Sequence, residues 1–190
     1  PTNNTFKNNT IENFYYYAYY NYYTNGNQFL NNEVTRKTSR GHASGARVMY
    51  SYYVRSTNRS TKFDGNHIHD LPYAGATTGS GTFYVGYMYR CYGTSSNAVT
   101  FNDNKIEDVI CSSSNYWVYG YYNYHAQYNG NTIKNWNSNT TSTHYGFYIY
   151  YSYNGVQFKN NHIENVKTNR TTYFARSSLI LCRKSQIGWG

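Results

Sequence analysis

Side chains that could catalyse a reaction or bind a metal are scarce in this chain of 190 residues, which has eight acidic residues, six histidines and three cysteines. Asp70 and Asp108 stand at the same place in two copies of an eight-residue phrase that recurs along the chain, so they could lie one repeat apart. Such a pair would be at most a weak metal site. The neighbouring Glu107 should point to the opposite face of its strand. The alternative is structural, with both aspartates accepting hydrogen bonds from backbone N–H groups.

The histidines and cysteines show no arrangement of known chemistry. His67 and His69 flank Ile68, so in a strand they lie on the face opposite to it and could chelate a metal or transfer protons. His162 occupies the same place as His67 three repeats later, about 14 Å away by strand spacing and too far to cooperate. Three cysteines cannot form a complete disulfide framework. The sequence has no zinc spacing, phosphate-binding loop or nucleophile elbow.

The aspartates and histidines named above lie in or near copies of the repeated phrase, so the structure of the phrase determines where they are placed. The phrase consists of an aromatic residue, two small or polar residues, an asparagine, and then an aliphatic residue between two variable ones. Its copies begin 23 to 38 residues apart, and such self-similarity indicates stacked repeats. The copies are Phe6–Asn13, Phe29–Arg36, Phe63–Asp70, Phe101–Asp108, Tyr128–Asn135 and Phe158–Asn165. The asparagine is present in all of them, as Asn9, Asn32, Asn66, Asn104, Asn131 and Asn161.

Each phrase predicts a strand end, a corner and a new strand. We expect the asparagine at the corner, because it tolerates the left-handed conformation that a tight corner needs. Stacked at about 4.8 Å, the asparagines could hydrogen-bond in a ladder. The six aromatic residues should form one internal column. A second internal column is predicted from Ile11, Val34, Ile68, Ile106, Ile133 and Ile163.

This phrase resembles the repeat of right-handed parallel β-helix proteins, which include pectate-lyase-like enzymes, phage tailspikes and bacterial surface proteins. The resemblance covers roughly residues 5–175. It implies an all-β fold, a right-handed parallel β-helix (solenoid) of about six coils. We expect residues 1–190 to form a single solenoid segment of a longer chain. The resemblance is specific for the fold and says little about function.

The resemblance also implies what an enzyme of this fold would need. β-Helix lyases use clustered carboxylates that hold Ca²⁺, with an arginine or lysine as base, and β-helix hydrolases use aspartates on adjacent strands. If this chain is such a polysaccharide lyase or glycoside hydrolase, the candidates are Asp70, Asp108 and Lys105. The shortage of carboxylates favours a non-catalytic protein without a cofactor.

Tyrosine is the stronger functional signal. Of the 27 tyrosines, 24 fall in the five segments 14–23, 48–54, 83–92, 116–124 and 145–153. Because aromatic residues occupy both alternating faces of these segments, one face should fill the core, and the other should be free to stack against sugar rings or dock a protein. A purely structural use of tyrosine as a strand former is the alternative. The candidate binding residues are Tyr16, Tyr20, Tyr52, Tyr87, Tyr121 and Tyr150.

Four tyrosine segments contain a small residue followed by tyrosine, which predicts a common register. These dipeptides are Ala18-Tyr19, Ser51-Tyr52, Gly86-Tyr87 and Gly120-Tyr121.

The net charge of +9 is concentrated, since seven of 17 basic residues lie between Arg36 and Lys62. We expect residues 35–47 to form a projecting loop whose positive charge attracts polyanions, with a merely solvated loop as the alternative. The basic candidates for binding are Arg36, Lys37, Arg40 and Arg47.

These observations together predict a non-catalytic, structural or adhesive protein. It would lie extracellularly or on a cell or virion surface and bind polysaccharide, surface glycan or neighbouring protein subunits. Nucleic acid is disfavoured, because the basic residues concentrate in loops and the tyrosines in strands. No hydrophobic run approaches the ~18 residues of a membrane helix.

Overall fold

The computed structural model describes residues 2–36, 45–74, 81–138, 144–168 and 172–178. Within these ranges the chain forms 17 strands and no helix. The strands belong to three sheets, and every pairing between them is parallel. The arrangement is a right-handed parallel β-helix, as the repeated phrase predicts; the number of coils stays a prediction.

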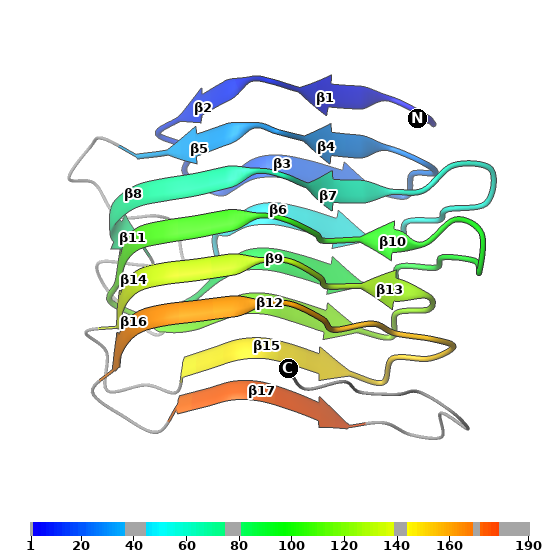
Figure 1. Cartoon of the computed structure of the whole chain (residues 1–190). Coiled ribbons are helices and arrows are strands. Elements are labelled where there is room, and N and C mark those ends of the chain that lie inside the picture. Colours follow the sequence, from blue (N-terminus) through cyan, green and yellow to red (C-terminus); the bar gives the residue numbers. More distant parts are fainter. Residues whose placement is uncertain (1, 37–44, 75–80, 139–143, 169–171, 179–190) are drawn as a thin grey trace.

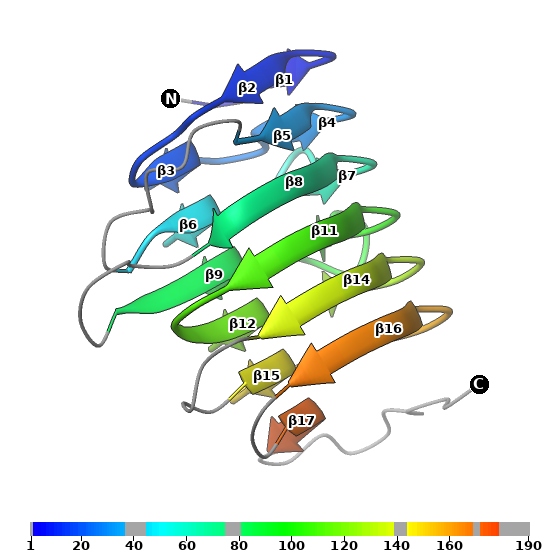
Figure 2. The same cartoon turned by 90° about the vertical axis from the view of Figure 1, so that its left-hand side faces the viewer.

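Each coil contributes a strand to each sheet in turn. The first sheet has the order β1-β4-β7-β10-β13, the second β2-β5-β8-β11-β14-β16 and the third β3-β6-β9-β12-β15-β17. In Figure 1 the first and second sheets lie side by side in front and the third lies behind them; Figure 2 shows the second and third sheets as separate walls.

The first sheet consists of β1 (Thr5–Lys7), β4 (Gln28–Leu30), β7 (Lys62–Asp64), β10 (Val99–Thr100) and β13 (Ala126–Gln127). The second consists of β2 (Thr10–Glu12), β5 (Glu33–Thr35), β8 (His67–Ala74), β11 (Lys105–Cys111), β14 (Thr132–Ser138) and β16 (His162–Thr168). The third consists of β3 (Tyr17–Tyr22), β6 (Arg47–Tyr52), β9 (Thr82–Tyr89), β12 (Ser114–Tyr121), β15 (His144–Tyr150) and β17 (Thr172–Ser178).

The two predicted core columns are present. The inner aromatic residues Phe29, Phe63, Phe101 and Tyr128 are at most 1% exposed, and the inner aliphatic residues of the phrases are fully buried. The outermost members are less buried, with Phe6 47% and Ile163 37% exposed. They have a stacked phrase on one side only within the described residues, which is why the prediction of burial fails for them.

The fixed asparagines form the predicted ladder from Asn9 to Asn161. At an inner step, Asn66 donates from its backbone N–H and from Nδ2 to Oδ1 of Asn104, both over 3.0 Å. Nδ2 of Asn104 donates to Oδ1 of Asn131 over 3.0 Å and to the Phe63 carbonyl oxygen over 2.8 Å. The same amide-to-amide hydrogen bond joins each of the remaining neighbours in the column. The donors and the acceptor of each inner side-chain amide are therefore all engaged in hydrogen bonds with neighbouring coils.

The corner conformation corrects one expectation. The left-handed residue is the one before the fixed asparagine, with φ between 51° and 67°. These residues are Asn8, Asn31, Gly65, Asp103, Gly130 and Asn160. At Gly130 a Cβ would lie 2.1 Å from Oδ1 of Asp103, so a larger residue there would have to displace that side chain, and glycine adopts the left-handed φ without strain. The fixed asparagine is needed for the hydrogen bonds of the ladder and not for the left-handed conformation of the corner.

In the part of the chain that the structure describes, no helix is long and apolar enough to cross a membrane.

Candidate functional site

From β3 to β15, the outer surface of the third sheet is built almost entirely from tyrosine. In β6, Arg47, Tyr50 and Tyr52 point outward and are half-buried, while the residues between them are buried. Two consecutive residues, Val48 and Met49, are buried, so strict alternation is interrupted there. The same pattern recurs in β9, β12 and β15.

Parallel pairing in register places like residues above one another in columns. We call four of these columns the tyrosine face. The first column is Tyr17, Arg47, Tyr84, Tyr116 and Tyr145, and the second is Tyr20, Tyr50, Tyr87, Tyr119 and Tyr148. The third is Tyr22, Tyr52, Tyr89, Tyr121 and Tyr150. The fourth, just beyond the strands, is Tyr23, Tyr53, Arg90, Tyr122 and Tyr151.

The rings within a column stack on one another. In the second column successive ring centroids are 5.0, 5.3, 5.1 and 5.6 Å apart, with interplanar angles of at most 15°. Parallel rings at such separations are offset-stacked, so each inner ring covers the faces of its neighbours. The ring edges and hydroxyl groups are left toward the outside. In the inner coils the ring faces are therefore covered by neighbouring rings, and an outside partner would meet ring edges and hydroxyl groups.

Burial and neighbouring rings change the acidity of these phenols. Burial, followed by the neighbouring tyrosines, raises the pKa of Tyr50 and Tyr119 well above the ordinary value of 10. Burial also raises the pKa of Tyr87 to about 12, against the lowering effect of Arg47. The hydroxyl groups of Tyr50, Tyr87 and Tyr119 are therefore protonated at neutral pH and can donate as well as accept hydrogen bonds.

The tyrosine face carries positive charge and no carboxylate. The Arg47 guanidinium lies 4.5 Å from the ring centroid of Tyr87 and also contacts the rings of Tyr50 and Tyr84. Arg90 takes the equivalent place in the fourth column, 4.9 Å from the ring centroid of Tyr53. All eight acidic residues belong to the phrases, on the first and second sheets or the corner between them: Glu12, Glu33, Asp64, Asp70, Asp103, Glu107, Asp108 and Glu164.

The predicted binding tyrosines occupy different parts of this surface. Tyr20 and Tyr87 belong to the second column, and Tyr52, Tyr121 and Tyr150 to the third. Tyr16 precedes β3, is 52% exposed and contacts Tyr15 and Tyr17.

The predicted common register of the small-residue and tyrosine pairs is wrong. Ser51-Tyr52 and Gly120-Tyr121 share a level, but Gly86 pairs with Met49, and Tyr19 is buried inside. The four pairs fall at three different levels, because Gly86 is level with Met49, and Tyr19, not Ala18, is level with both.

The basic candidates are likewise separated. Arg47 lies in the tyrosine face, which contradicts the expected division between basic loops and tyrosine strands. Arg36 is only 2% exposed and donates from Nη1 to the Phe14 carbonyl oxygen, so it is not part of an exposed basic loop. Lys37 and Arg40 lie outside the described residues.

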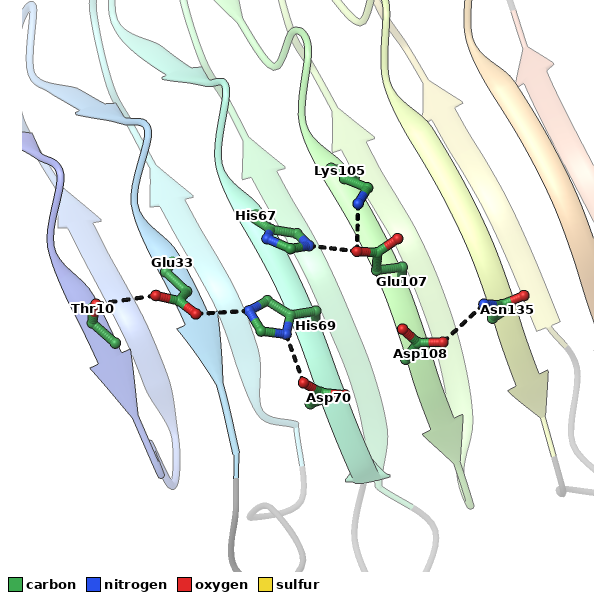
Figure 3. Close-up of polar contacts among 9 residues, drawn as sticks. All are labelled: Thr10, Glu33, His67, His69, Asp70, Lys105, Glu107, Asp108 and Asn135. Carbon is green, nitrogen blue, oxygen red and sulfur yellow. Dashed lines mark hydrogen bonds and ion pairs between the residues drawn. The ribbon is translucent and has the colours of Figure 1, made fainter.

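A second group of polar side chains lies on the outer face of the second sheet (Figure 3). Glu107 bonds Nε2 of His67 over 2.7 Å and Nζ of Lys105 over 2.5 Å. His69 bonds Glu33 over 3.0 Å and Asp70 over 2.8 Å. The two imidazole rings stack 4.0 Å apart, on the face opposite to Ile68 as predicted. The hydrogen bond from His69 lowers the pKa of Glu33.

The candidate catalytic residues are only partly brought together. Asp70 and Asp108 line one depression of about 620 Å³, together with Arg36, Pro72, Ile110, Asn135 and Asn137. Nδ2 of Asn135 donates to Asp108 over 2.9 Å, and Lys105 bonds Glu107 instead of either aspartate.

The expectation that Glu107 and Asp108 point to opposite faces is wrong. Asp108 has φ of 54°, which breaks the alternation, and both side chains point outward.

Sequence reasoning missed the partners of the histidines, although the aligned phrases contained the signal. His67 and Glu107, and Glu33 and His69, are diagonal neighbours on adjacent strands. Long side chains reach each other at such positions. Within the described residues, no group of three or more His, Cys, Asp and Glu side chains is arranged to hold a metal ion.

Comparisons of the chain with protein-family models, with curated proteins and with solved structures found no match.

Proposed function

We propose that this chain is a non-catalytic, structural or adhesive β-solenoid that binds extended glycans along the tyrosine face. The observation that carries the proposal is the set of four columns of the tyrosine face. In these columns phenol rings, with their edges and hydroxyl groups outward, repeat once per strand across β3, β6, β9, β12 and β15. Such a surface suits a long ligand with many hydroxyl groups. The proposed location is extracellular, on a cell or virion surface, where such glycans occur.

The chemistry of the contact follows from the stacking of the rings. Because the inner ring faces are covered by their neighbours, the proposed contacts are hydrogen bonds to the phenol hydroxyls and van der Waals contacts to the ring edges. Tyrosine makes such contacts at low entropic cost, and stacking restricts the rings further. Arg47 and Arg90 add positive charge, so binding of an acidic glycan should weaken as salt rises.

A glycan array probed with the purified protein tests this proposal. We expect binding that is lost in Tyr87→Ala and retained in Thr132→Ala, a control on the second sheet outside the depression lined by Asp70 and Asp108. A charge control, Arg90→Ala, should reduce the salt dependence for acidic glycans. No glycan binding by a folded protein would refute the proposal, and capture of a protein or single-stranded nucleic acid through the same tyrosines would replace it.

A polysaccharide lyase or glycoside hydrolase is the second candidate. One observation favours it: Asp70 and Asp108 line the same depression, as two catalytic carboxylates would. Depolymerisation of an acidic polysaccharide by the wild-type protein, absent in Asp108→Ala, would establish this function. Absence of turnover across acidic and neutral polysaccharides would exclude it for the substrates tested.

A further inference from the structure

The second and third columns of the tyrosine face form a regular lattice of parallel rings. Along the third column successive centroids are 5.4, 5.0, 5.2 and 5.6 Å apart, close to the values in the second column. Between the two columns the centroids are 5.8–6.4 Å apart, with interplanar angles of at most 20°. The ten rings therefore share one orientation over five strands.

This lattice sets a condition on the ligand. In-register strands place equivalent side chains about 4.8 Å apart along the solenoid axis. A linear ligand that places one of its units against each successive ring must advance by nearly that distance per unit. A ligand with a different advance per unit makes one or two good contacts and then falls out of register.

The glycosidic linkage decides whether a glycan meets this condition. A β-1,4 linkage between equatorial positions gives a straight two-fold ribbon, whose advance per sugar is close to the spacing of strands in a sheet. An α-1,4 linkage gives a coiled chain with a shorter advance. Only the first kind of chain can stay in register with five successive strands.

The contacts match such a ribbon across its width as well. Its equatorial hydroxyl groups lie along both edges, and each phenol hydroxyl can donate and accept a hydrogen bond. The two columns are accessible, since Tyr20 and Tyr22 are 52% and 43% exposed and the inner rings are half-buried. A ribbon lying along the axis would thus contact one ring of each column per sugar.

We propose that the tyrosine face takes β-1,4-linked glycan ribbons, laid along the second and third columns with one sugar per strand. This inference rests on the proposed function, because it concerns the same surface, and it adds the linkage class and the direction of the bound chain.

Calorimetric titration with two matched series of oligosaccharides tests the linkage. Cello-oligosaccharides and malto-oligosaccharides contain the same sugar and differ only in the anomeric linkage. For the β-1,4 series we expect affinity to rise about tenfold or more between cellobiose and cellopentaose, because each added sugar gains a contact worth a fraction of one tenfold step. The α-1,4 series should show no such rise.

The position of a substitution tests the direction of the chain. Tyr87→Ala interrupts the second column at its centre, so it should abolish the dependence on oligomer length. Tyr20→Ala removes a terminal ring and should weaken only the longest oligomers. Thr132→Ala, on the second sheet, should bind like the wild type, and circular dichroism and thermal melting would verify that each variant is folded.

The outcomes separate this inference from the proposed function. Equal affinity for both series, or affinity independent of length, would overturn the inference. The proposed function would stand in that case if Tyr87→Ala still reduced binding. Lack of binding to any glycan by the folded protein would overturn both. A length-dependent rise in the β-1,4 series alone, lost in Tyr87→Ala, would support both.

Discussion

The asparagine ladder and the tyrosine face both stack like residues once per coil, but hydrogen bonds hold the first and ring stacking holds the second. The ladder contains asparagine at all six positions. The tyrosine columns contain Arg47 and Arg90 and continue on both sides of them. An amide must present its acceptor to one coil and its donor to the next, whereas stacking needs only a flat, polarisable surface such as a guanidinium. Stacking by hydrogen bonds is therefore the more exacting of the two.

The two regions also differ in how pH acts on them, and the largest effect is expected here. Burial and neighbouring rings raise the pKa of Tyr50, Tyr116 and Tyr119 in the folded state, whereas tyrosine in the unfolded chain ionises near pH 10. The folded state then binds more protons above pH 10. Stability is fully present below that pH and is lost as pH rises toward the folded pKa values. We expect cooperative unfolding on raising the pH above 10, whereas the amides of the ladder do not titrate.

Circular dichroism and phenolate absorbance, recorded together, measure this transition. Both signals should change at one midpoint, and Tyr119→Phe should move that midpoint to higher pH by removing one of the groups. Titration of the outward tyrosines near pH 10 with an intact fold would contradict the argument.

The ladder gives the next largest effect. Asn104→Ala leaves the backbone N–H and Nδ2 of Asn66 without their acceptor and the Phe63 carbonyl oxygen without its donor. Buried groups left in this way cost about 1–3 kcal/mol of unfolding free energy. Urea unfolding measures the loss. A control on the outer surface, Asn137→Ala, should stay within about 0.5 kcal/mol of the wild type; equal losses in the two variants would show that the ladder is not special.

These features differ in how well they could be predicted from sequence. The ladder and the core columns were predictable because the same kind of residue recurs at the same place in every phrase. A recurring asparagine indicates stacked hydrogen bonds, and a recurring aromatic or aliphatic residue indicates burial. The left-handed corner was misplaced because asparagine stands at both candidate positions in Asn8-Asn9, Asn31-Asn32 and Asn160-Asn161.

Two errors at the candidate sites have other causes. The tyrosine register was missed because Val48 and Met49 both point inward, and no residue type marks this interruption. The burial of Arg36 depends on the position of the Phe14 carbonyl oxygen, which belongs to a preceding coil and is not encoded near Arg36 in the sequence. A prediction that relies on strict alternation fails wherever two consecutive residues of a strand point inward.

The corner beside the ladder gives a smaller effect. Gly130 has φ of 67°, and a Cβ there would lie 2.1 Å from Oδ1 of Asp103. Gly130→Ala should therefore cost about 1–2 kcal/mol from the left-handed conformation, with an additional part from the contact. In an Asp103→Gly background the same substitution should cost only the conformational part, and thermal unfolding of both single variants and the double variant separates the two. No cost of Gly130→Ala in that background would show that φ contributes nothing.

The smallest effect is expected on the tyrosine face, from Tyr119→Arg. Tyr119 lies between Tyr87 at 5.1 Å and Tyr148 at 5.6 Å, an environment similar to that of Arg47 between Tyr17 and Tyr84. A guanidinium between two rings gains about 0.5–1 kcal/mol from cation–π contact at an exposed site, which should offset most of the lost ring stacking. Urea unfolding should then show a change within about 1 kcal/mol. The matched substitution in the ladder, Asn104→Gln, keeps the amide but displaces it by one methylene, and it should be as damaging as alanine. If Tyr119→Arg destabilises the protein as much as Asn104→Gln, the columns require the phenol itself, and the tolerance inferred from Arg47 and Arg90 is a property of those two positions alone.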